Sequence, residues 1–257
     1  MRTRSCRALL LLGVALAVGG QAPEADRRSG FDFMAPETQA LQRDDGANPG
    51  MLWVLEGETL WQEPAGSAGI SCAGCHGDAA ESMRGIAARY PAFDAATGRP
   101  IDLQGRINQC RQARQGAVPF AAESQELLAL TTAVAHQSRG MPVEPVADPN
   151  LTPFVAEGRK LFEQRIGQLD LSCAACHDRL WGQKLGGSVI PQAHPTGYPI
   201  YRLEWQSVGS LQRRMRNCMI GVRAEPYAWG APEFIALELY LRSRAEGLPV
   251  ETPGVRP

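Results

Sequence analysis

Two short cysteine motifs are the residues of this chain best suited to chemistry. Cys72-Ala73-Gly74-Cys75-His76 and Cys173-Ala174-Ala175-Cys176-His177 share the C-x-x-C-H spacing, which is typical of covalent haem c attachment. Cysteines three positions apart lie on one face of a helical turn, so both thiols can bond to one porphyrin while the following histidine reaches its iron. The sequence therefore predicts two covalently bound haem c groups, with His76 and His177 as iron ligands.

Two other uses of paired cysteines fit this spacing less well. The two C-x-x-C pairs of a four-cysteine zinc site usually lie about 15–20 residues apart, whereas Cys75 and Cys173 are separated by almost a full domain. A thioredoxin-like dithiol is expected in a βαβ setting, and neither motif has one around it. Haem would also supply a large apolar body to a chain with only 7% aromatic residues.

The elements that must position these motifs occur twice in the chain, because the sequence contains an internal repeat. The matching segments, in order, are Glu56-Gly57 with Glu157-Gly158, the two haem motifs, Tyr90-Pro91 with Tyr198-Pro199, Leu103-Gln104 with Leu211-Gln212, and Gly140-Met141-Pro142 with Gly247-Leu248-Pro249. The repeat predicts two tandem cytochrome c-like domains, residues 47–146 and 150–252, each built around one covalent haem. Residues 23–46 are interpreted as a polar leader.

The expected fold class is mainly α. Apolar residues recur at nearly helical spacing in four segments, Leu52–Trp61, Glu123–Gln137, Val155–Gln164 and Pro232–Ala245. Ser124 and Pro232 are suitable helix starts. Alternation typical of strands is scarce, and Gly- and Pro-rich loops follow each haem motif.

The first residues have the pattern of an export signal. Three arginines precede an apolar run from Ala8 to Val18, and small residues follow it, which predicts a secretory signal peptide over residues 1–22. The run is too short to cross a bilayer, and no other stretch approaches that length, so no membrane span is expected. We expect a periplasmic protein, and removal of Cys6 with the signal leaves six cysteines in an oxidising compartment.

Composition narrows the class of protein. With 21% charged and 44% hydrophobic residues, the chain is neither disordered nor collagen-like. The formal net charge is −1 and the pI is about 6.4. No broad basic surface follows from these values, so nucleic acid is not an expected partner.

The second axial ligand of each iron has several candidates, since methionine or another group can stand opposite the histidine, or the position can stay open. Some candidates lack an equivalent of the same type in the other repeat: Met83, His136, Met141, His194 and Met219. We interpret each of these as a packing or surface residue.

Cys110 and Cys218 are different, because they occupy equivalent places in the repeat, each after a haem motif. This equivalence suggests a cysteine thiolate on each iron. The alternative is a Cys110–Cys218 disulfide, which suits an oxidising compartment but requires both residues to meet between the domains.

Basic residues crowd the second of these cysteines. Arg213, Arg214 and Arg216 precede Cys218, and nearby positive charge stabilises a thiolate. Arginine also binds small oxyanions through its planar fork of donors, so the cluster suggests an anion site; a solvated run of surface charge is the alternative. Arg106 stands at the same spacing before the first cysteine, which indicates a partly structural role for arginine at this position, for example toward haem propionates.

These features together resemble the SoxA family, the larger haem-carrying subunits of the SoxAX cytochromes of bacterial thiosulfate oxidation. The resemblance rests on the repeat, the haem motifs, and the elements Leu103-Gln104-x-Arg106-Ile107-Asn108-x-Cys110 and Arg214-Met215-Arg216-Asn217-Cys218. It covers nearly the whole chain after the signal. Some family members lack the first haem, but this sequence keeps its motif and Cys110, so two haems are expected.

The resemblance implies an L-cysteine S-thiosulfotransferase-type haem enzyme with His/Cys-ligated haems and its active site at the C-terminal haem. Cys218 would be the catalytic cysteine, carried as a persulfide, and Arg214 the substrate-binding arginine. The implied reaction joins thiosulfate oxidatively to a cysteine of a SoxYZ-like carrier protein and passes electrons to cytochrome c. A SoxX-like monohaem cytochrome subunit would complete a heterodimer.

Two other functions remain open at this stage. A dihaem electron-transfer cytochrome without sulfur chemistry would need only a closed, inert ligand at Cys218. A dihaem peroxidase would need a distal site that can open, and neither repeat indicates one.

Overall fold

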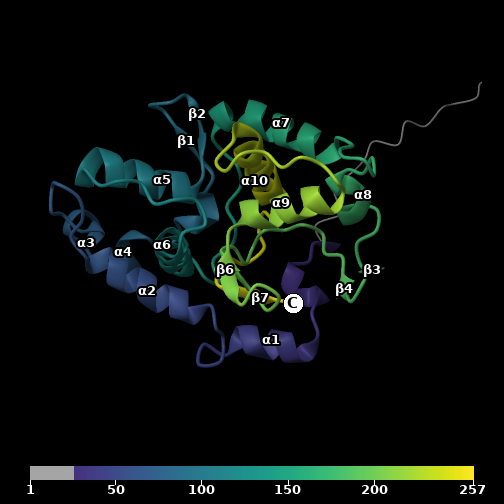
Figure 1. The fold of residues 1–257 in the computed structure, drawn as a ribbon, viewed down its shortest axis with the longest axis horizontal. Helices are drawn as coiled ribbons and strands as arrows, with labels where there is room; N and C mark the ends of the chain where they lie inside the picture. The colour runs from purple at the N-terminus through teal and green to yellow at the C-terminus, as the bar shows by residue number, and fades with distance from the viewer. Residues whose placement is uncertain (1–25) are drawn as a thin grey trace, which may run out of the picture.

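The computed structural model describes residues 26–257 and is mainly helical; the predicted signal peptide lies outside the described residues. In Figure 1 the N-terminal half lies to the left and the C-terminal half to the upper right. The chain begins with the 3-10 helix η2 (Gly30–Phe33) and α1 (Pro36–Arg43). The N-terminal half then contains α2 (Met51–Gln62), α3 (Cys72–His76), α4 (Ala79–Ser82), η3 (Ala87–Arg89), β1 (Ala92–Asp94), β2 (Arg99–Ile101), α5 (Leu103–Cys110), the π-helical turn η4 (Arg111–Gln115) and α6 (Gln125–His136).

The C-terminal half repeats this order of elements. It contains η5 (Pro149–Leu151), α7 (Thr152–Glu163), α8 (Cys173–His177), β3 (Lys184–Leu185), β4 (Ser188–Val189), β5 (Ile200–Arg202), β6 (Ser207–Gly209), α9 (Leu211–Gly221), α10 (Pro232–Arg244) and β7 (Gly254–Arg256). The four predicted helices are confirmed as α2, α6, α7 and α10. Ser124 caps α6 by accepting the N–H of Leu127, and Pro232 is the first residue of α10. The exact domain limits stay a prediction.

In each half the first and last long helices cross at a glycine. A Cβ on Gly57 of α2 would lie 2.1 Å from the carbonyl oxygen of Ala129 in α6. A Cβ on Gly158 of α7 would lie 2.0 Å from the carbonyl oxygen of Ala236 in α10. No side chain fits at such distances, so the repeated Glu-Gly dipeptide marks the closest approach of the two helices in both halves.

Each half has its own apolar core, and each core includes the first cysteine of a haem motif. In the N-terminal half, Cys72 packs against a cluster of buried side chains formed by Trp61, Leu130 and Val134. In the C-terminal half, Cys173 packs against a larger cluster formed by Phe162, Met219, Phe234, Leu237, Tyr240 and Leu241. The haem motifs are therefore fixed on apolar walls.

The two halves meet through equivalent segments of the repeat. The N–H of Gly140 donates to the carbonyl oxygen of Val250 at 2.8 Å, and the N–H of Gly247 donates to that of Val143 at 2.9 Å. Each of these hydrogen bonds is the repeat equivalent of the other, as in an isologous two-fold interface. The tandem repeat therefore packs like a pseudo-symmetric dimer within one chain.

A cavity of about 110 Å³ lies between the halves, and Asp102 and Glu238 both line it. The side chain of Gln212 donates to Asp102 Oδ2 at 3.0 Å and also bonds Glu238. Burial raises the pKa of both carboxyl groups, and the nearby Asp102 raises that of Glu238 further, to well above its ordinary value. Two carboxylates enclosed side by side repel each other, so each disfavours the charged form of the other.

Short strands, which the sequence analysis did not identify, form a sheet of order β6-β5-β7, and Figure 1 shows β6 and β7 near the centre of the molecule, between α9 and α1. Strand β5 pairs antiparallel with β6 and parallel with β7. Tyr201 of β5 packs edge-on against Trp53 of α2 at 5.9 Å between ring centroids, so the sheet joins the C-terminal half to the N-terminal half. Among residues 26–257, no helix has both the length and the apolar character needed to cross a membrane.

Candidate functional site

Both haem motifs form short helices with a serine N-cap. Ser71 Oγ accepts the N–H of Gly74 at 2.9 Å before α3, and Ser172 Oγ accepts the N–H of Ala175 at 3.1 Å before α8. The cap satisfies a backbone donor at the helix start and fixes the turn there. Each pair of motif cysteines is therefore held three positions apart on a helical turn, as thioether attachment requires.

The two cysteines outside the haem motifs, Cys110 and Cys218, here called the distal cysteines, also lie on capped helices. Asp102 caps α5, which carries Arg106 and Cys110, and Ser210 caps α9, which carries Arg214 and Cys218. The helical conformation places arginine and cysteine one turn apart on the same face.

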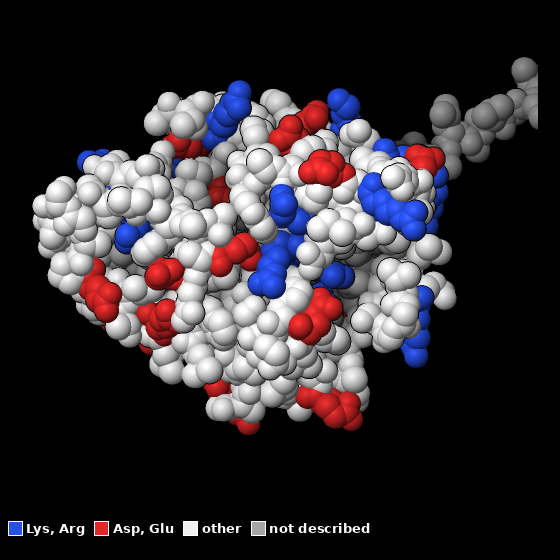
Figure 2. Space-filling model, viewed as in Figure 1, with Lys and Arg blue, Asp and Glu red and all other residues white. Residues whose placement is uncertain are grey.

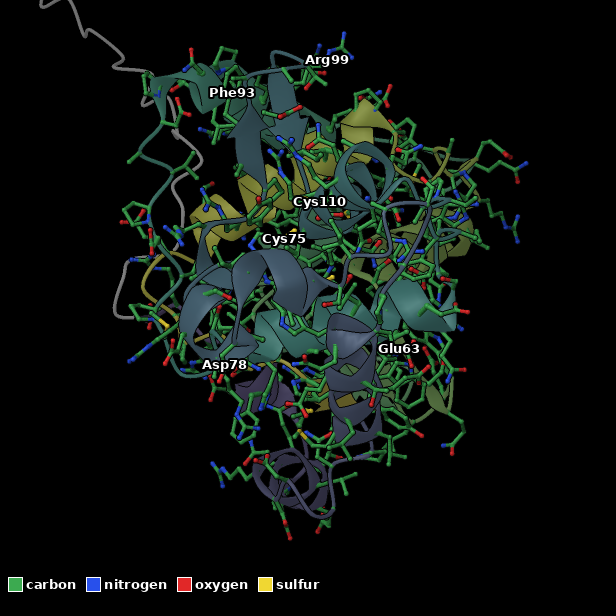
Figure 3. All side chains as sticks on the ribbon, turned by 90° about the vertical axis from the view of Figure 1, so that its left-hand side faces the viewer. Glu63, Cys75, Asp78, Phe93, Arg99 and Cys110 are labelled. Atoms are coloured by element: carbon green, nitrogen blue, oxygen red, sulfur yellow. The ribbon has the colours of Figure 1, made fainter. Side chains whose placement is uncertain are left out.

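Each distal cysteine lies near the haem motif of its own half. Figure 3 shows Cys110 beside Cys75 on the face of the N-terminal half. Burial raises the pKa of the Cys72 thiol, and the neighbouring Cys110 adds to the rise. Burial likewise raises the pKa of Cys173 to about 11, with a contribution from neighbouring Cys218. Among the described residues no disulfide joins Cys110 to Cys218, and each of them lies by the motif of its own half.

The two motif histidines lie beside equivalent aromatic rings. The ring of Trp61 is 5.8 Å from that of His76, and the ring of Phe162 is 6.5 Å from that of His177. His177 Nδ1 lies 2.7 Å from the carbonyl oxygen of Pro191. Because a carbonyl only accepts, Nδ1 carries the proton and leaves Nε2 available as a metal ligand. Burial lowers the pKa of His177, which favours the neutral, ligating form.

The histidines and methionines without a repeat equivalent have contacts of their own. His136 and His194 each bond a backbone carbonyl oxygen through Nδ1, at 3.2 and 2.6 Å. Met219 is buried in the C-terminal core, Met83 packs against the N-terminal core, and Met141 lies beside Gly85. These contacts support the interpretation of all five as packing residues.

At the N-terminal site the arginine before the cysteine is neutralised. Arg106 Nη2 lies 3.2 Å from Asp94 Oδ1, and Arg106 also bonds the side chain of Gln109. Asp94, which is 4% exposed, accepts further hydrogen bonds from Thr97 at 2.8 Å and from Gln109 at 3.2 Å. The charge of Arg106 is therefore paired with Asp94. The further cation near this site, Arg111, lies over the Phe120 ring and donates to the carbonyl oxygen of Val118 at 3.3 Å.

At the C-terminal site the equivalent strand position has the opposite charge. Asp94 is the last residue of β1 and pairs with the first residue of β2. In the same way, Arg202 is the last residue of β5 and pairs with the first residue of β6. Arg202 is 8% exposed. Its Nε lies 2.8 Å from Glu204 Oε1 as an ion pair, but without the geometry of a hydrogen bond. A largely buried cation therefore stands where the N-terminal half has a buried carboxylate.

Arg214 lies within the field of this second cation. Burial lowers the pKa of Arg202, and nearby Arg214 lowers it further. Burial also acts to lower the pKa of Arg214, but the neighbouring Cys218 and Tyr198 outweigh it, so that pKa is raised. Among the described residues, the Arg214 guanidinium has no hydrogen-bond partner. The arrangement offers unsatisfied arginine donors beside a sulfur atom, which suits a small oxyanion.

Further arginines extend the positive surface. Arg213 lies over the ring of Trp205 at 4.2 Å, and Arg216 lies over the ring of Trp229 at 4.5 Å. Figure 2 shows Lys and Arg side chains gathered over α9 near the centre of this face. The structure therefore brings the sequence-predicted Arg214 and Cys218 together.

Arg202 and Tyr198 were missed by the sequence reasoning as site residues. The repeat does contain a signal for Arg202. When the two halves are aligned on their Tyr-Pro pairs, Asp94 and Arg202 occupy equivalent positions. The strands that carry Asp94 and Arg202 are only three residues long. Such short strands show no hydrophobic alternation that would identify these residues.

The fold and the site together define a c-type cytochrome with two similar halves. The sequence profile of the SoxA/TsdA cytochrome c domain matches residues 56–143 and 157–250, and this family carries haem c. The SoxA subunit of L-cysteine S-thiosulfotransferase from Rhodovulum sulfidophilum is 39% identical over 89% of this chain and 80% of its own length. The corresponding subunit from Pseudaminobacter salicylatoxidans is 38% identical over 96% of this chain and 88% of its own length.

A solved structure gives the same result. The crystal structure of SoxXA from Paracoccus pantotrophus superposes with a TM-score of 0.86 and 35% identity, covering 90% of this chain and 87% of the matched chain. The chain belongs to the SoxA family.

Proposed function

We propose that this chain is the sulfur-transferring subunit of an L-cysteine S-thiosulfotransferase, and that it carries two haem c groups. Cys72, Cys75, His76 and Cys110 would hold the first haem. The C-terminal haem would be held in the same way by the second motif, Cys173-Ala174-Ala175-Cys176-His177, together with Cys218. The capped motif helices, the apolar walls and the position of each distal cysteine support this assignment.

The exchange of Asp94 for Arg202 between the two halves is the observation that carries the assignment of the active site. Thiosulfate is a dianion, so a site with more arginines than carboxylates favours its binding. The N-terminal site has its arginine neutralised by Asp94. The C-terminal site has Arg202 and Arg214 together beside Cys218, so thiosulfate is expected there.

The reaction is an oxidative joining of two sulfur atoms. A carrier thiol and thiosulfate give a carrier S-thiosulfonate, one proton and two electrons. Arg214 and Arg202 would bind the oxyanion end and orient the outer sulfur toward Cys218. The Cys218 sulfur can then take part in thiolate exchange with the carrier cysteine. Haem, when bound, supplies the one-electron acceptor from which electrons pass to cytochrome c.

The alternative is a dihaem electron-transfer cytochrome without sulfur chemistry. The arginines around Cys218 favour the enzyme, because an inert ligand needs no anion site. The decisive assay is thiosulfate-dependent cytochrome c reduction in the presence of the carrier protein. Cys218→Ala should abolish turnover, whereas the matched variant Cys110→Ala should alter the N-terminal haem spectrum and retain measurable thiosulfate use. Equal activity of Cys218→Ala and wild type would favour the electron carrier.

The partner and the compartment are further parts of the proposal. The solved relative is a SoxXA complex, so we propose a SoxX-like monohaem subunit as the stable partner of this chain. We also propose export to the periplasm by residues 1–22. Co-expression with the partner, size-exclusion chromatography and intact mass test both: a heterodimer whose larger chain lacks the signal is expected, and an uncleaved chain eluting alone would contradict it.

A further inference from the structure

We propose that residues 26–34, here called the N-terminal strap, position the proximal histidine of the C-terminal haem and thereby tune its reduction potential. The inference rests on the proposed haem at the second motif. The strap would act through residues 178–194, here called the proximal loop, which follows His177 and supplies its hydrogen-bond acceptor. The strap is thus a positioning element of the haem site, although it is far from the haem motif in sequence.

The strap is bound to the residue next to the acceptor of the histidine proton. His177 donates to the carbonyl oxygen of Pro191 at 2.7 Å. The following residue, Gln192, is 2% exposed. Its Oε1 accepts the N–H of Arg28 at 2.8 Å, and its Nε2 donates to the carbonyl oxygen of Asp26 at 3.0 Å. Both polar atoms of the buried Gln192 amide therefore form hydrogen bonds from the proximal loop to the backbone of the strap.

A histidine two residues further on makes a third tie. His194 Nδ1 lies 2.6 Å from the carbonyl oxygen of Arg28. Burial lowers the pKa of His194 to about 4, so the ring is neutral at physiological pH and donates through Nδ1. His194 was one of the residues without a repeat equivalent; its place in the structure is at this contact.

Aromatic contacts fix the outer end of the proximal loop. The ring of Phe33 meets that of Trp181 edge-on, with 6.2 Å between centroids, and the Arg28 guanidinium lies 5.9 Å from the Trp181 centroid. Ser29 Oγ also donates to Glu251 Oε1 at 2.6 Å. In Figure 1 the start of the described chain runs beside the segment that carries β3 and β4. The strap therefore contacts the proximal loop at both of its ends.

The inner side of the loop is held by α10. Arg244 Nη2 donates to Asp178 Oδ1 at 2.6 Å and to the carbonyl oxygen of Gln192 at 3.2 Å. The same guanidinium lies over the ring of Phe162, the aromatic neighbour of His177. Gln192, the residue after Pro191, is thus held by α10 on one side and by the strap on the other. Loss of the strap contacts would therefore leave the Pro191 carbonyl less firmly positioned.

The N-terminal half supplies an internal control. Within residues 26–257, the His76 ring makes no hydrogen bond to a carbonyl, and the strap contacts described above all lie in the C-terminal half. A partner that accepts the second ring proton makes a ligating imidazole more basic, which stabilises the oxidised metal. Loss of the strap should therefore raise the potential of the C-terminal haem and leave that of the N-terminal haem unchanged.

The test compares Gln192→Leu with Gln183→Leu in the full co-expressed complex. Gln183 lies in the same loop, but its side chain is exposed and makes no hydrogen bond in the described structure. For Gln192→Leu, amide hydrogen exchange should quicken in residues 26–34 and 178–192, and redox titration should show an upward shift at one haem only. Gln183→Leu should match wild type in both measurements. A variant lacking residues 26–34 should reproduce the shift if Gln192→Leu fails to fold.

The outcomes separate this inference from the proposed function. Faster exchange with both haem potentials unchanged would mean that the strap is only structural, and the inference would be wrong. A shift at the N-terminal haem would also overturn it. An intact mass showing no haem on the second motif would instead refute the proposed function, and the inference would fail with it.

Discussion

Replacing Arg202 by aspartate would give the C-terminal site the charge pattern of the N-terminal site. Asp94 lies 3.2 Å from Arg106, and an aspartate at position 202 stands at the equivalent strand position relative to Arg214. Two effects then add. The site loses one charge-assisted hydrogen bond to thiosulfate, worth about 1.5–3 kcal/mol. The new carboxylate also competes for Arg214, which costs a similar amount. We expect kcat/KM for thiosulfate to fall by roughly two to four powers of ten.

The neutral variant Arg202→Gln separates these two effects, because it removes the cation without adding a competitor for Arg214. It should lose only about one to two powers of ten in kcat/KM. The assay is thiosulfate-dependent cytochrome c reduction with the carrier protein, repeated at low and high salt. The difference between the variants should persist at high salt, because Arg202 is 8% exposed and buried charges are screened little.

The matched control is Asp94→Asn in the N-terminal half, which disturbs the equivalent position without touching the proposed active site. It should leave kcat/KM for thiosulfate within about threefold of wild type, a change of under 1 kcal/mol. Haem spectra and thermal midpoints establish that each variant is folded. If Arg202→Asp retains wild-type kcat/KM, or if Asp94→Asn is the more damaging change, the charge argument is wrong.

Three other predictions have defined outcomes. Arg214→Ala should keep the haem spectrum and lose about one to two powers of ten in kcat/KM, with Arg106→Ala much less damaging; the reverse order would contradict the assignment. Gly158→Ala places a Cβ 2.0 Å from the Ala236 carbonyl and should lower the free energy of unfolding by about 1–3 kcal/mol or more, whereas Gly221→Ala, with open space around it, should not. Because the pKa of Glu238 is raised in the folded chain, the contribution of Glu238 to stability should be fully present below about pH 4.5 and should be lost at about 1.4 kcal/mol per pH unit above it until the folded pKa is passed. Denaturant titrations should therefore show that the free energy of unfolding of Glu238→Gln increases relative to that of wild type as pH rises. If the difference between the two free energies does not change with pH, folding does not raise the pKa of Glu238.

The helices and haem motifs could be predicted because their signals are local. Apolar spacing marks α2, α6, α7 and α10, and a C-x-x-C-H motif needs only one helical turn. The repeat then identified Cys110 and Cys218 as equivalent, and the structure places each near the motif of its own half. These inferences needed no knowledge of how the two halves pack.

The remaining features depend on contacts between distant segments. The β5–β7 pairing joins residues 200–202 to 254–256, and strands this short carry no alternation that a sequence could reveal. The leader was interpreted as polar, yet it binds the C-terminal half through Gln192 and His194, whose partners are backbone groups and leave no pattern in the side chains. Neither residue type nor spacing identifies such partners.

The two halves together show why the fold alone does not distinguish the proposed active site from its counterpart. Both have the same crossing helices, the same capped motif, the same strand pair and an arginine one turn before a cysteine. A comparison of backbones would assign them the same role, because a fold positions groups without deciding their chemistry. The difference lies in the charged side chains: Asp94 closes a satisfied polar cluster with Arg106, whereas Arg202 stands at the same strand position beside Arg214, and Arg213 and Arg216 extend the positive surface. An electron-transfer site tolerates a closed cluster, but a site that must gather a dianion needs the charge left open, so the repeated architecture has one half suited to each task.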